Sequence, residues 1–401
     1  MNIFFKNAEI VLFDRNIKSC LEVRGKFIGK IFQESKPFFL PVDCTGLKIF
    51  PGFIDSHVHG GYGFDFEQNS EISYSKFSEN IVKEGVTKFL FTSVTSREEK
   101  ISECLKTFAS FYRNQRTFSK KNAICLGLHM EGPFISIEKK GAHKQNLIVN
   151  PNIELMKKWI KESNNTIKIV TFDIENDEDS LFLKFLNSKK IIGSVGHSNS
   201  TAKTFVEKAG DVGIHRVTHL FNGMSGLLHS NPGVAAAALN DKRVLCELIC
   251  DGFHVNEHLI KIAYSCKKAE GIVLITDAMS AKGEPDGFYK LGELDVEKKE
   301  GKCVLKDTNT LAGSVVSFSS CFKNFHDWIQ PSDQELALVS SYNVAKQLRL
   351  HNVIGEIKEG FLADLTIVNN NYEVVMTVCE GEISYIKEGY EHILNNNEVS
   401  A

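Results

Sequence analysis

Eight short apolar runs recur through the central part of this chain, and a longer polar or amphipathic stretch follows each of them. They cover residues 47–55, 86–94, 123–131, 167–173, 191–197, 214–219, 244–250 and 272–277. Buried parallel strands read as continuous apolar runs, and intervening stretches such as 152–163 and 198–209 have helical spacing. Eight such units in about 230 residues match the size and rhythm of a TIM barrel. We therefore expect an α/β fold with a (β/α)8 TIM-like barrel over residues 51–349.

The two ends of the chain resemble each other and differ from the middle. Residues 21–24 and 26–31 roughly alternate apolar and polar side chains, and residues 365–368 and 374–378 are short β-rich runs. Neither end has enough strand to bury a core alone. We expect residues 1–50 and 350–401 to form one small β-sandwich domain, with a frayed tail at 395–401.

The composition is that of a soluble globular protein, with 42% apolar and 24% charged residues. The 47 Lys and Arg against 50 Asp and Glu give a net charge of −3, with no basic stripe for nucleic acid and no polybasic membrane anchor. No run approaches the ~18 apolar residues of a membrane span, so we expect a cytoplasmic protein. The ten cysteines form no CxxC pair and are expected to be reduced core residues.

Five of the eight runs finish in residues that can bind a metal ion. His57 and His59 close the first run, and residues two apart on a strand point to the same side. Glu131, His197, His219 and Asp277 end the third, fifth, sixth and eighth runs. In a barrel all these positions meet at the C-terminal mouth. Imidazole and carboxylate without thiolate suit zinc, iron or a related divalent ion.

A lone histidine or carboxylate at a strand end is more often a hydrogen-bonded core residue than a ligand. It is the shared position of all these candidates, at the same end of their strands, that favours a metal site. His129 shares the face of Glu131 and is interpreted as structural or as a partner of a ligand. His254 and His258 have the spacing of a zincin helix, but Val255 stands where that motif needs Glu.

Asp277 has a second possible role. A carboxylate beside a metal-bound water can take its proton and later deliver that proton to a leaving amine. Metal coordination lowers the pKa of the water toward ~7 and polarises a scissile carbonyl. The residues alone therefore indicate metal-assisted hydrolysis of an amide-like bond.

The PGFIDSHVH strand, the final TDA strand and the terminal sandwich together resemble the amidohydrolase superfamily. LHMEGPF, KKGAH, GHSNST, THLFNGM, NPGV, DGFHV, ITDAMSAKG and LAGS follow in this order and look like the motifs of N-acetylglucosamine-6-phosphate deacetylases. The combination is specific, whereas any one motif alone is not. The resemblance implies a homodimeric hydrolase that removes acetate from N-acetylglucosamine 6-phosphate and gives glucosamine 6-phosphate in amino sugar catabolism.

The resemblance also implies roles for individual residues. Glu131, His197 and His219 would hold the principal metal, and Asp277 would be the general acid and base. His143, in KKGAH, would contact the substrate and help to stabilise the tetrahedral oxyanion. The sugar-phosphate pocket would be lined by Ala142, Asn222, Gly223, His254 and Ala312.

Two features of the chain bear on this resemblance. Because His57 and His59 are both present, it implies one or two ions per subunit, with Glu131 as the bridge and Asp277 as a further ligand. Where the family has an arginine that grips phosphate, this chain has Ser230. A serine supplies neither the charge nor the bidentate contact of arginine. Either His229, His254 or a lysine elsewhere compensates, or the substrate is a different or unphosphorylated N-acetyl amino sugar.

Two other classes of function were weighed. A cyclic-amide hydrolase or deaminase of the same superfamily would share the His57/His59 strand and Asp277, but Glu131 within EGPF and the KGAH motif disfavour it. A non-catalytic barrel used as a scaffold should have lost metal ligands, and here all of them remain.

Overall fold

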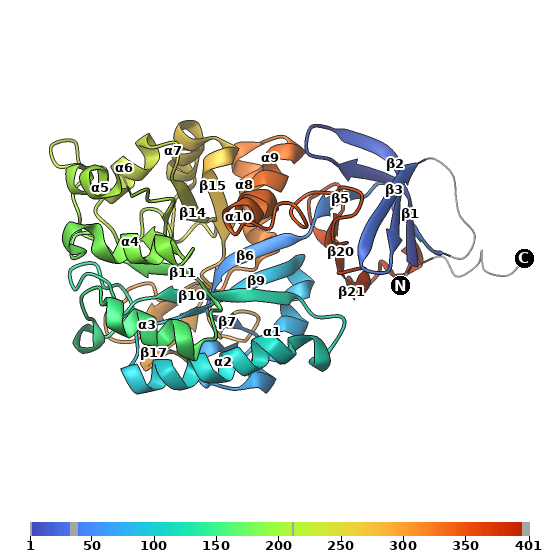
Figure 1. The fold of residues 1–401 in the computed structure, drawn as a ribbon. Coiled ribbons are helices and arrows are strands. Elements are labelled where there is room, and N and C mark those ends of the chain that lie inside the picture. The colour runs from blue at the N-terminus through green and yellow to red at the C-terminus, as the bar shows by residue number, and fades with distance from the viewer. Residues whose placement is uncertain (1, 33–38, 211, 395–401) are drawn as a thin grey trace, which may run out of the picture.

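Eight parallel strands form one sheet that closes into a barrel in the computed structural model, which describes residues 2–32, 39–210 and 212–394 (Figure 1). In chain order these strands are β6 (Phe53–Val58), β9 (Val86–Ser93), β10 (Ile124–Glu131), β11 (Ile167–Phe172), β12 (Ile192–Val195), β13 (Arg216–Val217), β14 (Leu245–Ile249) and β15 (Ile272–Ile275). Each lies next to its predecessor in the sheet. The predicted (β/α)8 barrel is confirmed, since seven of the eight apolar runs contain one of its strands and the first run contains the beginning of β6.

The seam of the barrel lies between β15 and β6, the two ends of the hydrogen-bonded order. The backbone N–H of Asp277 donates to the carbonyl oxygen of His57 at 2.9 Å, and the Thr276 hydroxyl donates to Asp55 at 2.6 Å. These bonds bring the residues that follow the last strand against the first strand.

Helices cover the outside of the barrel, as their sequences require. Asn152 caps the first turn of one of them, which buries Met156 and Trp159 against the sheet and exposes its lysines. The helices are α1 (Glu71–Asn80), α2 (Glu98–Phe118), α3 (Ile153–Glu162), α4 (Leu181–Ser188), α5 (Ala202–Ala209), α6 (Val234–Asn240), α7 (Glu257–Lys267), α8 (Phe318–Ile329), α9 (Asp333–Ala337) and α10 (Asn343–Gln347). Short turns of 3-10 helix are η1 (Phe66–Gln68), η2 (Ile81–Glu84), η3 (Gln145–Leu147), η4 (Glu178–Ser180), η5 (Ala269–Gly271) and η7 (Glu391–Ile393), and η6 (Leu338–Tyr342) is a π-helix.

Both ends of the chain contribute to a second, mostly antiparallel sheet, on the right of Figure 1. Its strands are β1 (Asn2–Val11), β2 (Asn16–Arg24), β3 (Phe27–Phe32), β4 (Leu40–Asp43), β5 (Lys48–Pro51), β19 (Leu365–Val368), β20 (Val374–Cys379) and β21 (Glu382–Ile386). The two ends meet where β5 pairs with β19. The expected β-sandwich built from both termini is confirmed. The expected frayed tail at 395–401 lies outside the described residues.

The first apolar run is two strands, not one. Residues 48–51 form β5 of the terminal sheet, and residues 53–58 form β6 of the barrel. Gly52 stands between them, where a Cβ atom would lie 2.2 Å from the Thr87 hydroxyl oxygen. The chain therefore passes from one sheet to the other at a residue that must be glycine, and periodicity alone could not show this change of sheet.

Buried ion pairs join the terminal sheet to the barrel. Lys88 of β9 binds Asp364 at 2.6 Å, and both side chains are buried. Arg116 of α2 makes two bonds to Glu380, one of them 2.6 Å long, and Lys26 reaches the same carboxylate at 3.2 Å. Glu380 therefore forms ion pairs with side chains of both the barrel and the terminal domain.

Strands within residues 283–310 form a small antiparallel sheet. Its strands are β16 (Gly287–Leu291), β17 (Leu294–Lys299) and β18 (Lys302–Leu305). Leu291, Val296 and Cys303 pack with Val94 and Met279 in a separate apolar cluster. A further hairpin, β7 (Gly60–Gly61) with β8 (Phe64–Asp65), follows directly after His59.

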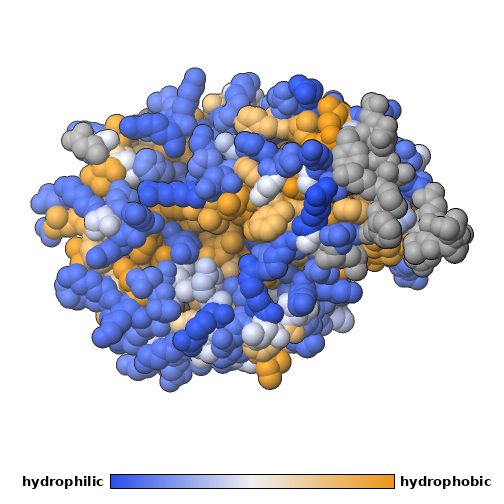
Figure 2. Space-filling model, turned by 45° about the vertical axis from the view of Figure 1, so that its right-hand side comes forward, coloured by the Kyte–Doolittle hydropathy of each residue, from blue (hydrophilic) through white to orange (hydrophobic). Residues whose placement is uncertain are grey.

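The surface and the thiols agree with the expected class of protein. The face shown in Figure 2 is mostly hydrophilic, with apolar surface gathered near its middle. None of the helices in the described ranges is both long enough and apolar enough to cross a membrane. All ten cysteines are free thiols, and most are buried, as the lack of paired motifs predicted.

Candidate metal centre

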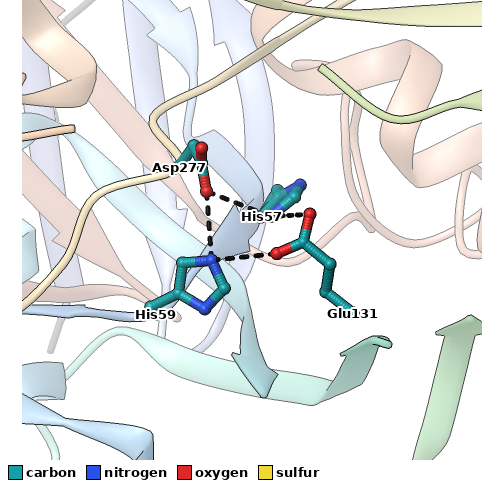
Figure 3. A group of neighbouring side chains, drawn as sticks. All are labelled: His57, His59, Glu131 and Asp277. Carbon is teal, nitrogen blue, oxygen red and sulfur yellow. Dashed lines mark hydrogen bonds and ion pairs between the residues drawn. The ribbon is translucent and has the colours of Figure 1, made fainter. Parts of the chain in front are cut away.

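The six predicted metal ligands converge at the C-terminal ends of the barrel strands. His57 lies on β6 and Glu131 ends β10, whereas His59, His197, His219 and Asp277 stand just beyond their strands. All six are buried. Their ligand atoms form two groups that could each hold an ion: His57, His59, Glu131 and Asp277, shown in Figure 3, and Glu131, His197 and His219. We call these groups the HxH subsite and the two-histidine subsite.

Glu131 belongs to both subsites because its two oxygens lie close to histidines of each. Its Oε1 lies 3.3 Å from His197 Nε2 and 2.9 Å from His219 Nε2. Its Oε2 lies 3.3 Å from His59 Nε2, while His57 Nε2 is 3.6 Å from Oε1 (Figure 3). This arrangement is that of a bridging carboxylate between neighbouring cation positions.

Asp277 completes the HxH subsite from the opposite side of the barrel seam. Its Oδ1 lies 3.0 Å from His59 Nε2 and 3.2 Å from His57 Nε2, as the dashed lines in Figure 3 show. The four ligand histidines are oriented in the same way, since each directs Nδ1 to an oxygen acceptor and Nε2 toward the centre. The acceptors are Glu247 for His57, and the carbonyl oxygens of Thr92 for His59, Lys139 for His197 and Asn222 for His219. An imidazole that donates through Nδ1 offers the lone pair of Nε2 to a metal.

Three ligands have a left-handed backbone, which sequence patterns did not indicate. The φ angles of His197, His219 and Asp277 are 45°, 29° and 51°. A side chain with a Cβ atom rarely adopts this conformation, and such residues gather at functional sites. Here the turn directly after each strand places the side chain over the barrel mouth.

Two glycines make room for the His197 ring. A Cβ atom on Gly223 would lie 2.9 Å from His197 Nδ1, and one on Gly141 would lie 3.1 Å from its Cε1. Both glycines also have positive φ. The GAH and NGM motifs therefore have a local structural reason, which is the close approach of backbone to a ligand.

The charges of the cluster are arranged around a place for cations. Burial lowers the pKa of His59, but hydrogen bonds and charge from Asp277 and Glu131 outweigh burial and raise it to about 10. Burial raises the pKa of Asp277, yet the charge of His57 and the hydrogen bond and charge of His59 hold it well below its usual range. Two buried carboxylates thus stabilise positive charge between them.

The donor set fits a divalent ion of the zinc or iron type. It consists of imidazole nitrogens and carboxylate oxygens, and no thiolate contributes. His57 Nε2 is fully buried and has no hydrogen-bond partner, although Asp277 and Glu131 lie nearby. A buried nitrogen with an unused lone pair among acidic oxygens is the environment of a metal ligand.

His143 lies beside the cluster with a defined tautomer. The backbone N–H of Thr95 donates to His143 Nδ1 at 3.3 Å, and the Thr95 hydroxyl lies 2.8 Å from the same atom. Since Nδ1 accepts, the proton of the neutral ring is on Nε2, which is 3.9 Å from Glu131 Oε2. Burial and the charge of His197 lower the pKa of His143 to about 3, so the ring is a neutral donor aimed at the centre.

Of the other predicted pocket residues, Asn222 and Gly223 lie against ligand rings, whereas Ala142, Ala312 and His254 have other partners. Asn222 and Gly223 follow His219, and the Asn222 carbonyl holds its ring. Ala142 and Ala312 pack in the apolar cluster beneath the small antiparallel sheet, where Ala312 is fully buried. His254 binds Asp251 at 2.6 Å through Nδ1, and not a metal ligand.

Sequence reasoning missed Glu247 and Arg216, which lie directly behind the centre. Glu247 Oε2 is 2.9 Å from His57 Nδ1, and Glu247 Oε1 is 2.7 Å from Arg216 Nε. Both side chains are fully buried. A carboxylate in the middle of the apolar run 244–250 was the available signal, because a charged residue at a core position needs a partner.

Comparison with known proteins agrees with this geometry. The sequence profile of the Amidohydrolase family matches residues 49–286. An N-acetylglucosamine-6-phosphate deacetylase from Bacillus subtilis (strain 168) is 35% identical over 392 residues, which cover 98% of this chain and 96% of that protein.

Two solved structures share the whole fold. That of N-acetylglucosamine-6-phosphate deacetylase from Thermotoga maritima has a TM-score of 0.86 at 36% identity, over 96% of this chain and 100% of that one. A mutant of N-acetyl-D-glucosamine-6-phosphate deacetylase from Mycobacterium smegmatis, solved in complex with N-acetyl-D-glucosamine-6-phosphate, has a TM-score of 0.87 at 25% identity, over 96% and 99% of the two chains.

Proposed function

Because the chain belongs to the amidohydrolase family and, within it, to the N-acetylglucosamine-6-phosphate deacetylases, we propose that it hydrolyses the acetamide of N-acetylglucosamine 6-phosphate. The products are acetate and glucosamine 6-phosphate. The observation that carries the proposal is the buried cluster in which Glu131 faces both subsites and Asp277 faces His57 and His59.

The residues of the centre have complementary tasks in this reaction. One or two divalent ions would be held by Glu131, His197 and His219 and by His57, His59 and Asp277, and would supply Lewis acidity toward the acetyl carbonyl and toward water. Asp277 accepts a proton from the attacking water and returns it to the amine nitrogen as the carbon–nitrogen bond breaks. With that proton the amine leaves neutral, and the water oxygen and its second proton leave in acetic acid, which ionises to acetate.

His143 stabilises the charge that develops on the acetyl oxygen. Its neutral ring presents Nε2–H to the cluster, because Thr95 occupies Nδ1. A fixed N–H donor toward the developing oxyanion lowers the barrier more than it favours the substrate. Ala142, Asn222, Gly223, His254 and Ala312 complete the proposed sugar-phosphate pocket.

Recognition of the phosphate is the feature in which this chain differs from the family. Ser230 is exposed and carries no charge. Arg97 and Lys144 lie near the mouth beside a cavity of about 590 Å³, but Glu293 binds them at 3.5 and 2.7 Å. Lys139 and Lys140 are in the loop whose carbonyl holds the His197 ring. If none of these cationic side chains binds the phosphate, the substrate is a different or unphosphorylated N-acetyl amino sugar. This is the alternative to the proposed substrate.

The assembly and the compartment are also part of the proposal. We expect a cytoplasmic enzyme that forms a homodimer. Size-exclusion chromatography with light scattering distinguishes a dimer from a monomer.

Acetate release from a panel of substrates tests the proposed function. The panel contains N-acetylglucosamine 6-phosphate, its C4 epimer, unphosphorylated N-acetylglucosamine and dihydroorotate. A kcat/KM at least about 100-fold higher for the first than for the unphosphorylated sugar, about 2.7 kcal/mol, supports phosphate recognition without the arginine. Equal rates for the two sugars favour the alternative substrate, and hydrolysis of dihydroorotate alone contradicts the proposal.

A further inference from the structure

Glu247 makes contacts that reach both subsites from inside the barrel. We propose that Glu247, held in place by Arg216, is a positioning residue that presents His57 to a metal ion and makes the HxH subsite a tight binding site. The proposal rests on the proposed metal-dependent function, and it concerns which residues decide the number of ions bound.

The contact between Glu247 and His57 determines how the imidazole is used. Glu247 Oε2 lies 2.9 Å from His57 Nδ1, and neither side chain is exposed to solvent. A carboxylate accepts but cannot donate, so His57 carries its proton on Nδ1. The lone pair of Nε2 is then directed toward Asp277 and Glu131, where Nε2 has no hydrogen-bond partner.

Arg216 determines how Glu247 is oriented. Its Nε donates to Glu247 Oε1 at 2.7 Å, and its other nitrogens reach Gln347 Oε1 at 2.5 Å and the Ser56 hydroxyl. Arg216 has no exposed surface, so its charge requires Glu247 as a partner. The guanidinium occupies one oxygen of Glu247 and leaves the other for His57.

The side chains around Glu247 are unsuited to binding a third ion. His57, His129 and Glu247 lie close enough to hold one, but every nitrogen and oxygen on that side has a partner. His129 Nδ1 lies 3.3 Å from the Ser56 carbonyl, and His129 Nε2 lies 2.7 Å from the Thr171 hydroxyl. A cation placed there would also adjoin Arg216. The group therefore orients a ligand, and it is not a further metal site.

The effect is expected to differ between the two subsites. In the HxH subsite Glu247 binds the ring of His57 itself. In the two-histidine subsite it accepts only the backbone N–H of His219 at 3.0 Å, and the His219 ring is held by the Asn222 carbonyl instead. The His197 ring is oriented by the carbonyl oxygen of Lys139, which is far in the sequence from Glu247 and Arg216. Loss of the carboxylate should weaken one ion much more than the other.

The substitution Glu247→Gln tests this difference with little change in shape. The amide oxygen would pair with Arg216, which turns the NH2 group toward His57 Nδ1 and toward the backbone N–H of His219. Two donors would then face each other unless the His57 proton moves to Nε2, where it blocks the lone pair. Replacement of an outer partner of a ligand typically weakens metal binding about 10- to 100-fold.

The readout is metal binding, measured without substrate. Apoprotein is titrated with Zn²⁺ in competition with a chromophoric chelator, and bound metal is counted by mass spectrometry. We expect two ions per subunit for the wild type. In Glu247→Gln one ion should keep its affinity, and the dissociation constant of the other should rise 10- to 100-fold. The matched control is Glu380→Gln, which also removes a glutamate from an arginine but lies at the domain junction, and it should bind both ions normally.

Each other result contradicts the proposal. Wild-type affinity for both ions in Glu247→Gln, equal weakening of both ions, or a single ion in the wild type would overturn it. Should Glu247→Gln fail to fold with Arg216 unpaired, the double variant R216M/E247L removes both charges and must show the same selective loss of one ion. Deacetylase activity does not enter this readout, so failure of the proposed function is recognised separately, in the substrate panel.

Discussion

Glu380 provides a quantitative test of how the terminal sheet is held to the barrel. It binds Arg116 of α2 and Lys26, and Lys88 lies 3.8 Å away. The perturbation is Glu380→Gln, which keeps the size of the side chain and removes its charge. Lys88 retains Asp364 at 2.6 Å, so no fully buried cation is left alone.

The expected loss of stability in Glu380→Gln follows from the pKa of Glu380. Burial raises this pKa, but the bonds and charges of Arg116 and Lys88 outweigh burial and lower it from 4.5 to about 2. The difference between these two pKa values corresponds to at most about 3.4 kcal/mol. Because the Arg116 side chain is 53% exposed, solvent screens the pair, and we expect about 1.5 kcal/mol. With an unfolding entropy of about 2.1 cal/mol/K per residue, Tm should fall by about 2 °C.

The sign of the pH dependence is determined by the lowered pKa. A carboxyl group with a lower pKa in the folded state stabilises the fold above its unfolded pKa near 4.5, and this contribution is lost as the pH falls toward 2. The difference in Tm between the wild type and Glu380→Gln should therefore be largest at pH 7 and should shrink between pH 4.5 and pH 2.

Thermal unfolding followed by circular dichroism measures this difference at a series of pH values. The control is Glu373→Gln, which breaks the exposed pair with Lys387 in the same sheet and should change stability by less than about 0.5 kcal/mol. A Tm difference that is absent at pH 7, or that grows on acidification, would refute the reasoning.

Three further predictions concern the reaction itself. Asp277→Asn should lower kcat by about 10²- to 10⁴-fold while the ion of the two-histidine subsite stays bound, as acetate release and metal content measure; near-normal turnover would exclude Asp277 as the proton carrier. Treatment with a chelator should abolish activity and lower Tm, and added Zn²⁺ should restore both, whereas activity that survives complete removal of metal contradicts the mechanism. His143→Asn should lower kcat by about 10²- to 10³-fold with a smaller change in KM, since the ring donates mainly in the transition state; a change confined to KM would instead assign it to substrate binding.

Much of the fold was predictable because buried parallel strands leave a direct trace in the sequence. The runs at 86–94 and 123–131 became β9 and β10 almost without change. The run at 47–55 reads as one strand in the sequence but is part of two, since both strands are buried and apolar and only Gly52 marks the change of sheet.

Part of the candidate site was predictable because its residues stand at the ends of parallel strands. Residues that end parallel strands must meet at one mouth, so His57, His59, Glu131 and Asp277 could be grouped without coordinates. The positive φ of Asp277 and the pairing of Glu247 with Arg216 could not, because the first depends on contacts between the two ends of the barrel and the second on which side chains face each other across the neighbouring strands β13 and β14.

The passage of the chain through Gly52 has a consequence for the order in which the enzyme can mature. The Gly52 N–H donates to the Asp364 carbonyl, and the Phe53 N–H donates to the Thr366 hydroxyl, 313 residues away. The strand that carries His57 therefore gains its final support only after the last strands of the chain emerge from the ribosome. A nascent chain that already contains every metal ligand would still lack a finished HxH subsite. Loss of the C-terminal strands, which hold no ligand, should accordingly abolish metal retention at that subsite.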